Sequence, residues 1–254
     1  VQALHRGLTG PFTVSEAAEI LAMDSTATLK LLSYLAGRGW LTSVSHGLYL
    51  APPLDATDPT ARREDPWIVA AKLFAPCYVG GWSACEHWGL TDQIFREIVV
   101  VSARRSRRRA TVIQDTPFRV KVRGEHMLFG TQTVWRGRVA VAVSDPTRTI
   151  VDVLDDPAIG GGMRHVADTV TSYVEEDYRD DAQLDEYASR LGNRTVYKRL
   201  GYVIETVGIA APELAGLCLV RKSSGLTDLD PTAGGSGRIN RRWDLRINVR
   251  LGDE

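Results

Sequence analysis

Arginine is concentrated in one short segment of the chain. Five of six consecutive residues are arginine: Arg104, Arg105, Arg107, Arg108 and Arg109. Such a segment can neutralise nucleic-acid phosphates and release their counterions. It can also pair with acidic side chains of a protein partner, or stay a solvated loop. We predict a loop or hairpin tip between two strands here, and the three roles remain open.

Charge is distributed unevenly along the chain, although its formal net charge is zero. Residues 96–126 carry a net charge of +6, whereas residues 152–186 carry −9. An asymmetry of this size predicts one face for an anionic partner and another that repels it.

A predicted helix in the first fifty residues offers a second set of candidates. Asp24 or Ser25 caps this helix. Its apolar face holds Leu29, Leu32, Leu35 and Ala36, with Thr28 and Leu31 at the edges. The opposite face is small and polar, and it carries Thr26, Ala27, Lys30, Ser33, Tyr34 and Gly37. Such a face fits the DNA major groove, where side chains contact base edges.

The segments around this helix predict a winged helix-turn-helix over residues 1–53. Thr13 and Glu16 form a capping box that starts an earlier helix. Apolar runs at 40–44 and 48–50 form a hairpin with Gly47 in its turn. Ser45 and His46 would lie at the wing tip, where His46 either contacts a phosphate or is an ordinary turn residue. A winged helix used only for protein contacts is the alternative.

The rest of the chain predicts a linker and a larger domain. Residues 54–65 have little apolar content and read as a linker, after which Asp65 and Pro66 start a helix. Strands are predicted at 97–101, 118–123 and 138–143, and an edge strand at 243–249. Helices are predicted at 145–154, 163–176, 181–191 and 194–207. The expected class is α+β, with a mixed α/β domain over 66–254.

The sequence offers little for catalysis. A nuclease needs clustered carboxylates to hold Mg²⁺, yet no acid precedes Lys121 within two residues. The glycine-rich residues 234–237 would suit a nucleotidyltransferase, but only Asp244 follows them where an acid pair is required. No nucleophile-elbow motif is present. We therefore predict that the protein is not an enzyme and takes no cofactor.

Metal binding and membrane insertion are also not expected. Cys85 and His87 have no second ligand pair nearby, so the three cysteines are interpreted as core residues and no metal site is predicted. They fit a cytoplasmic protein. No uncharged apolar run approaches 18 residues, which argues against a membrane span.

Several motifs together resemble a known family. They are residues 47–50 followed by Pro52, residues 78–84 and 87–91, residues 148–152 with Pro157 and residues 161–162, residues 198–203, and residues 248–249. In this order they resemble the AbiEi-type antitoxins of type IV toxin–antitoxin systems, which are bacterial transcriptional regulators. The matching positions are mostly glycines, apolar residues and caps, which indicates structural roles.

This resemblance implies a function. Such antitoxins repress their own operon by binding inverted repeats in double-stranded DNA through the N-terminal domain, for which a dimer on DNA is possible. Their C-terminal domain counters a cognate toxin of nucleotidyltransferase type, and direct contact with that toxin is left open. The alternative function is a one-component repressor whose larger domain senses a small ligand.

Overall fold

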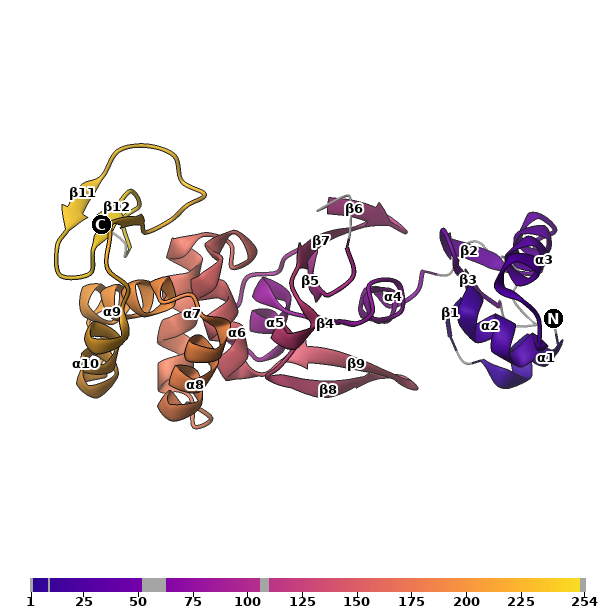
Figure 1. Ribbon diagram of the computed structural model, residues 1–254, viewed down its shortest axis with the longest axis horizontal. Coiled ribbons are helices and arrows are strands. Elements are labelled where there is room, and N and C mark those ends of the chain that lie inside the picture. Colours follow the sequence, from indigo (N-terminus) through magenta and orange to yellow (C-terminus); the bar gives the residue numbers. More distant parts are fainter. Residues whose placement is uncertain (1, 9, 52–62, 106–109, 252–254) are drawn as a thin grey trace. The chain divides into compact units, whose positions relative to one another are not determined.

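The computed structural model describes residues 2–8, 10–51, 63–105 and 110–251, and they divide into two compact units (Figure 1). The first unit comprises Val1–Val79, Arg96–Leu128 and Thr133–Ala142, and the second comprises Gly80–Phe95, Phe129–Gln132 and Val143–Glu254. The predicted boundaries at 53 and 66 stay predictions, since most of the predicted linker lies outside the described ranges.

The N-terminal part of the first unit, called the head here, contains three helices and three strands. In chain order these are α1 (Gln2–Gly7), β1 (Phe12–Thr13), α2 (Val14–Leu21), α3 (Ser25–Gly37), β2 (Thr42–Ser45) and β3 (Leu48–Leu50). β3 is the middle strand and pairs antiparallel with both β1 and β2. The two helices and the hairpin were predicted, but α1 and β1 were not.

Local side-chain bonds explain where the head helices start. The Thr13 hydroxyl accepts from the Glu16 amide at 3.3 Å, and the Glu16 carboxylate accepts from the Thr13 amide at 2.8 Å, which confirms the capping box. Asp24 is the cap of α3. Between them Ala22 adopts the left-handed conformation, with φ of 52°, and ends α2.

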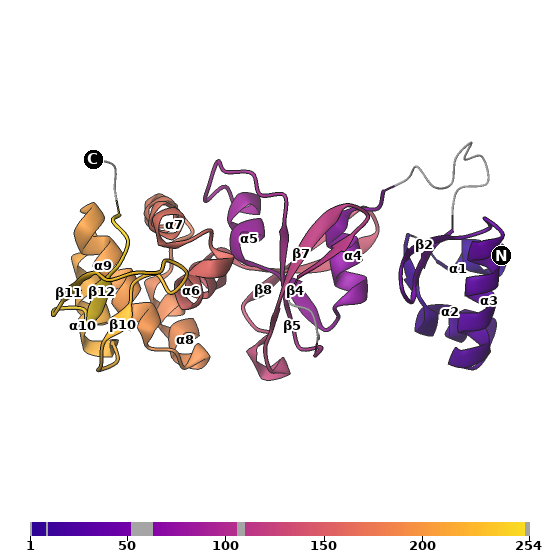
Figure 2. The ribbon, with the colours of Figure 1, turned by 90° about the horizontal axis from the view of Figure 1, so that it is seen from above.

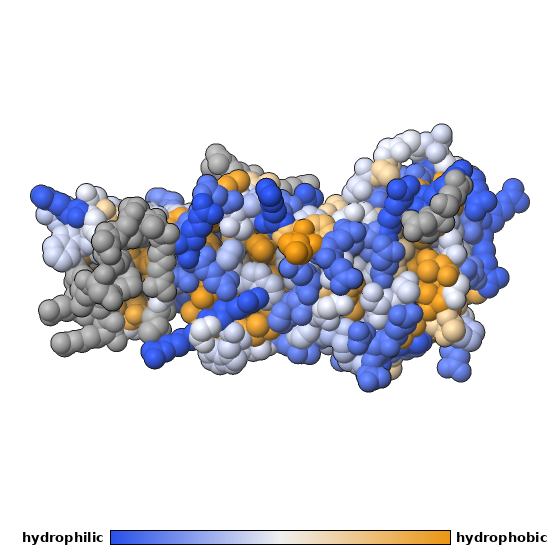
Figure 3. Space-filling model, turned by 180° about the vertical axis from the view of Figure 1, so that it is seen from behind, coloured by the Kyte–Doolittle hydropathy of each residue, from blue (hydrophilic) through white to orange (hydrophobic). Residues whose placement is uncertain are grey.

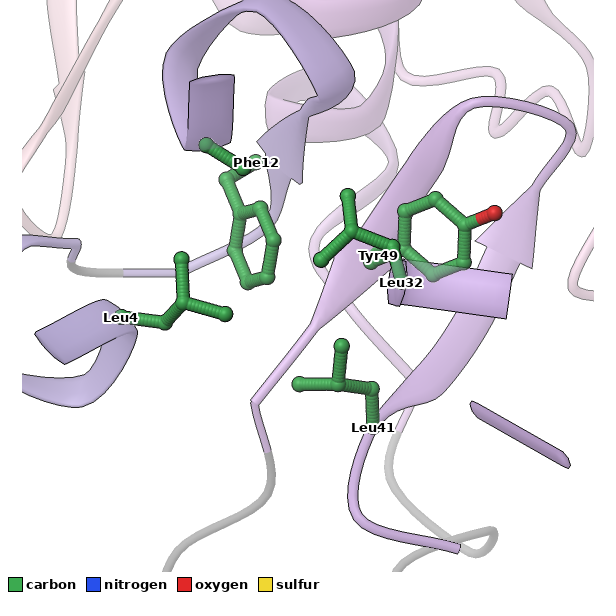
Figure 4. Close-up of a cluster of buried hydrophobic side chains, with 6 residues drawn as sticks. Leu4, Phe12, Leu32, Leu41 and Tyr49 are labelled. Atoms are coloured by element: carbon green, nitrogen blue, oxygen red, sulfur yellow. The ribbon is translucent and has the colours of Figure 1, made fainter. Parts of the chain in front are cut away.

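The core of the head draws on both the predicted and the unpredicted elements. Its buried side chains are Leu4, Phe12, Ala17, Leu32, Leu41 and Tyr49, most of which Figure 4 shows. Leu4 from α1 and Phe12 from β1 therefore complete a core that α2 and α3 begin. Thr28 is fully buried instead of lying at an edge, and Trp40 is 58% exposed before β2 instead of continuing a strand.

A six-stranded sheet occupies most of the remaining first unit. It follows α4 (Pro66–Leu73), which Asp65 caps as predicted. Its strands are β4 (Cys77–Val79), β5 (Ile98–Ser102), β6 (Ala110–Ile113), β7 (Thr116–Val122), β8 (Thr131–Arg136) and β9 (Val139–Ser144). They lie in the order β6-β7-β5-β4-β9-β8, with β5 and β7 parallel. The three strands predicted between 97 and 143 are confirmed.

The strand order corrects one expectation about the arginine segment. β6 pairs with β7, and β7 lies between β6 and β5. The chain from β5 to β6 therefore joins two strands that are not neighbours, so the hairpin alternative is wrong and the loop alternative remains, while residues 106–109 lie outside the described ranges. The hairpin is formed by β6 and β7 around Gln114 and Asp115, which both have positive φ, as a tight type of turn requires.

The second unit is mainly helical. Its helices are α5 (Gly81–His87), α6 (Pro146–Asp155), α7 (Met163–Glu175), α8 (Asp181–Leu191), α9 (Thr195–Val207) and α10 (Pro212–Arg221). α6 contacts α5, α7, α8 and α9, and all its residues from 147 to 154 are buried. The predicted mixed α/β class, with the main strands before most helices, is confirmed.

A small sheet ends the second unit beside α9 and α10 (Figures 1 and 2). It contains β10 (Thr227–Asp228), β11 (Arg238–Asn240) and β12 (Leu245–Ile247). The prediction of an edge strand at 243–249 is wrong, because β12 is the middle strand. Trp243 precedes it and is fully buried against α9, where a Cβ on Gly201 would lie 2.0 Å from the indole ring.

One face of the molecule carries both polar and apolar residues. On the side that Figure 3 shows, hydrophilic residues cover most of the area and hydrophobic residues form separate patches. Within the described ranges, no helix is both long enough and apolar enough to cross a membrane.

Candidate nucleic-acid interface

The outer face of α3 displays the residues that the sequence singled out. Thr26, Lys30, Ser33 and Tyr34 are exposed, and Ala27 is half-buried. Tyr34 is 59% exposed. The Lys30 ammonium has no hydrogen-bond or ion-pair partner among the residues described. The helix thus presents donors and an aromatic ring to solvent.

The start of α3 is occupied by its own cap. The Asp24 carboxylate accepts from the amides of Thr26 at 2.9 Å and Ala27 at 3.0 Å. These amides are the groups that would otherwise attract an anion at a helix N-terminus. Because a carboxylate already holds these amides, a partner of this face would meet the side chains further along the helix.

Those side chains form a stripe at four-residue spacing. Lys30, Tyr34 and Arg38 follow one another on the same side of the helix. The Arg38 guanidinium carbon lies 5.5 Å from the centre of the Tyr34 ring, within cation–π range. Arg38 was not among the residues predicted for this face, although its four-residue spacing from Tyr34 could have indicated it.

The hairpin is fixed to α3 by a hydrogen bond between hydroxyl groups. Ser33 Oγ lies 3.2 Å from the hydroxyl of Tyr49, a buried residue of β3. Ser33 therefore positions the helix on the hairpin in addition to being exposed. At the hairpin turn, His46 is exposed and Ser45 is half-buried.

The arginine segment is described only at its start. Arg104 and Arg105 are exposed, while Arg107, Arg108 and Arg109 lie outside the described residues. The Arg104 guanidinium donates to the Leu73 carbonyl at 2.8 Å, at the C-terminal end of α4. A cation at that position also interacts favourably with the helix dipole. The Arg104 guanidinium is thus bound to α4. The choice between nucleic-acid binding, protein binding and a solvated loop stays open for the segment as a whole.

Unlike the exposed face of α3, the second unit contains a cluster of charged residues that are buried and paired. The Arg148 side chain bonds Asp152 at 3.0 Å, and both are buried. Its guanidinium carbon lies 3.9 Å from the centre of the Phe129 ring, and that of Arg190 lies 3.8 Å from the same centre. This cluster, made of Phe129, Asp145, Arg148, Asp152 and Tyr187, is called the α6 cluster below.

The acid at the start of α6 is bonded as well. Asp145 accepts from the Arg148 amide at 2.7 Å and from the Tyr187 hydroxyl at 3.0 Å. Burial raises the pKa of the Asp145 carboxyl above its usual value. Because each of these polar groups is engaged by another, the α6 cluster holds the helices together and has the character of a structural site.

A surface cleft of about 380 Å³ in the second unit has paired groups on its walls. Arg199 donates to the carbonyls of Leu154 and Leu229, and Arg246 pairs with Asp228. The Asn193 amide donates to the Asp155 carboxylate. The side chains of the cleft thus form bonds within the second unit, to backbone carbonyls for Arg199 and to carboxylates for Arg246 and Asn193.

The candidate metal residues are dispersed. Cys85 is completely buried, and burial raises the pKa of its thiol to about 12. His165 is bonded to Thr91 and to the Gly160 carbonyl. In the part of the chain that the structure describes, no three His, Cys, Asp or Glu side chains are grouped as metal ligands.

Comparisons with known proteins identify a shared fold. No protein-family model and no curated protein matches the chain. The chain is similar to the crystal structure of the RV2827C protein from Mycobacterium tuberculosis, with a TM-score of 0.62 and 16% sequence identity. The match covers 96% of this chain and 88% of that one. At this identity the similarity concerns the fold over nearly the whole chain.

Proposed function

We propose that the head is a winged helix-turn-helix that binds double-stranded DNA. The observation that carries this proposal is the exposed face of α3, with Lys30 and Tyr34 at its middle and a hairpin fixed beside it. The order of the elements, α1-β1-α2-α3-β2-β3, is the one expected of a winged helix, and it supports the same function.

In this proposal α3 enters the major groove. Lys30 and Tyr34 contact base edges, with Thr26 and Ala27 closer to the start of the helix. The hairpin turn with Ser45 and His46 lies over the sugar–phosphate backbone. The Asp24 carboxylate keeps phosphate away from the first turn, because like charges repel.

We further propose that the protein represses its own operon as an antitoxin of the AbiEi type, as its motifs suggest. The motifs that resemble this family are largely buried: Trp82, Ala84, Ile150 and Val203 are each no more than 5% exposed. Their burial supports a structural role for these positions, and we propose that the protein acts as a regulator without enzymatic activity. Metal-dependent cleavage or nucleotide transfer, lost when a carboxylate of the second unit is replaced, would contradict this.

The DNA-binding proposal is tested with Lys30→Ala. Loss of a base contact should weaken binding to the DNA upstream of the gene by about 1–3 kcal/mol in a gel-shift titration. Ser15→Ala, an exposed change on α2, is the matched control and should leave binding unchanged. Circular dichroism verifies that both variants fold. Equal affinity of Lys30→Ala and wild type would refute the assignment of α3.

The antitoxin proposal needs a separate test. The gene next to this one on the chromosome is expressed alone and together with this protein, and growth is scored. Rescue of growth by the wild-type protein supports an antitoxin. A repressor without a toxin would bind its operator normally and give no rescue, so the two proposals can fail independently.

A further inference from the structure

The C-terminal sheet carries exposed arginines that lie outside the arginine-rich segment at residues 104–109. Arg238 begins β11 and Arg241 follows its end, and both are exposed. Neither has a hydrogen-bond or ion-pair partner among the described residues. β11 is an edge strand of this sheet, so its outer side is open to a partner.

The neighbouring acids are already bound to other groups. Glu205 pairs with Arg242, Asp228 with Arg246, and Asp244 with Lys222. Asp230 accepts from the Met163 amide at 2.8 Å and from the Thr232 hydroxyl at 2.6 Å. Among the described residues, the acids of the three ion pairs are bound to cations other than Arg238 and Arg241.

The loop before β11 allows close approach to the backbone. Gly234, Gly235 and Ser236 are all exposed, and no atom lies within 4 Å of where a Cβ would stand on either glycine. Gly235 has a φ of 111°, which other residues rarely adopt. Next to Arg238, Ile239 is 59% exposed and adds an apolar contact.

We propose that this surface, formed by residues 234–237 and β11 through Arg241, binds the phosphate backbone of a duplex nucleic acid. Arginine is suited to this partner because its planar guanidinium donates two parallel hydrogen bonds to a phosphate. Arg238 begins β11 and Arg241 lies in the turn just after its end, so the two guanidinium groups extend from different points of the chain. Small exposed loop residues leave room for the sugar–phosphate chain.

A phosphate backbone is favoured over an acidic protein segment by the shape of this surface. An acidic segment added to the edge of β11 would gain its specificity from a row of pockets for alternate side chains. This surface instead offers two separated cations and a loop without side-chain bulk. The binding is independent of sequence and does not depend on the proposed function of the head.

The test compares two double variants of the full chain. Arg238→Gln with Arg241→Gln removes the two cations without partners. Arg221→Gln with Arg242→Gln removes two exposed arginines of the same unit that pair with Asp185 and Glu205. Both double variants lower the net charge by two, so a general charge effect acts on them equally.

Binding to a mixed-sequence DNA duplex and to an RNA duplex is titrated over a range of salt concentrations. Loss of two phosphate contacts should lower the slope of log K against log salt by about 1.8, at about 0.9 per contact with DNA. The control pair should retain the wild-type slope. The two duplexes tell which nucleic acid the surface prefers.

Two results would overturn the proposal. Equal slopes for both double variants on both duplexes would show that Arg238 and Arg241 do not contact phosphate. Altered self-association in sedimentation, with unchanged slopes, would assign the surface to the acidic residues of a second copy instead. Lys30→Ala should weaken only sequence-specific binding, so failure here is distinct from failure of the head to bind DNA.

Discussion

The α3 face and the α6 cluster contain similar kinds of residue in opposite environments. On α3, Lys30 and Tyr34 point into solvent. In the α6 cluster, Arg148 is 1% exposed and is bound to Asp152 and to the face of Phe129. The comparison shows that the presence of a cation and an aromatic residue does not by itself indicate a binding site.

The difference has a physical cause. Removing a charge from water costs several kcal/mol unless opposite charge and hydrogen bonds replace the water. Arg148 and Asp152 satisfy this condition together, so they stabilise the fold only as a pair. Lys30 stays hydrated, so its charge remains available to a partner and its removal should not affect folding.

The strongest test of this comparison breaks the buried pair. Asp152→Ala leaves the Arg148 guanidinium buried without its carboxylate, and should lower the free energy of unfolding by about 3–5 kcal/mol. Urea denaturation followed by circular dichroism measures the change. Asp228→Ala removes a partner of Arg246 that is 41% exposed, and should cost less than about 1 kcal/mol.

A variant that does not fold would leave the first measurement incomplete, so Asp152→Asn serves as a second step. This substitution keeps a hydrogen-bond acceptor for Arg148 but removes the negative charge. Its free energy of unfolding should lie between those of the wild type and Asp152→Ala. Stability of both Asp152 variants equal to wild type would mean that the α6 cluster does not hold the second unit together.

A smaller effect is expected where α9 meets Trp243. In Gly201→Ala the new methyl group would overlap the indole ring, and such overpacking costs about 1–3 kcal/mol. Gly216→Ala is the matched control, because it also lies in a helix but has no atom within 4 Å of the added Cβ. It should raise stability by about 0.5–1 kcal/mol. The midpoint temperatures of thermal denaturation should therefore shift in opposite directions, down for Gly201→Ala and up for Gly216→Ala.

The smallest effect concerns the bond between α3 and the hairpin. Tyr49→Phe removes the hydroxyl that bonds Ser33, and should cost about 0.5–1.5 kcal/mol of stability. DNA affinity should fall less than in Lys30→Ala, because Ser33 positions the helix while Lys30 contacts the bases. A larger loss of affinity for Tyr49→Phe, measured by gel shift, would assign the main role to the orientation of α3.

Local signals in the sequence determined much of this fold. Three helix starts depend only on bonds within a few residues: the Thr13–Glu16 capping box, the Asp24 cap and the Asp65–Pro66 pair. These helix starts can therefore be predicted without knowledge of the rest of the chain. The exposed face of α3 followed from helical periodicity for the same reason. These signals predicted most of the long helices and the central strands.

Pairing between distant segments was decided only by the tertiary structure. β1 is two residues long and exists because Phe12 and Thr13 pair with β3. β12 alternates like an edge strand, yet Thr227, Asp228 and residues 238–240 flank it on both sides. The strand order likewise placed β7 between β5 and β6. Such pairings depend on which surfaces are buried together, and alternation along one segment carries no information about its neighbours.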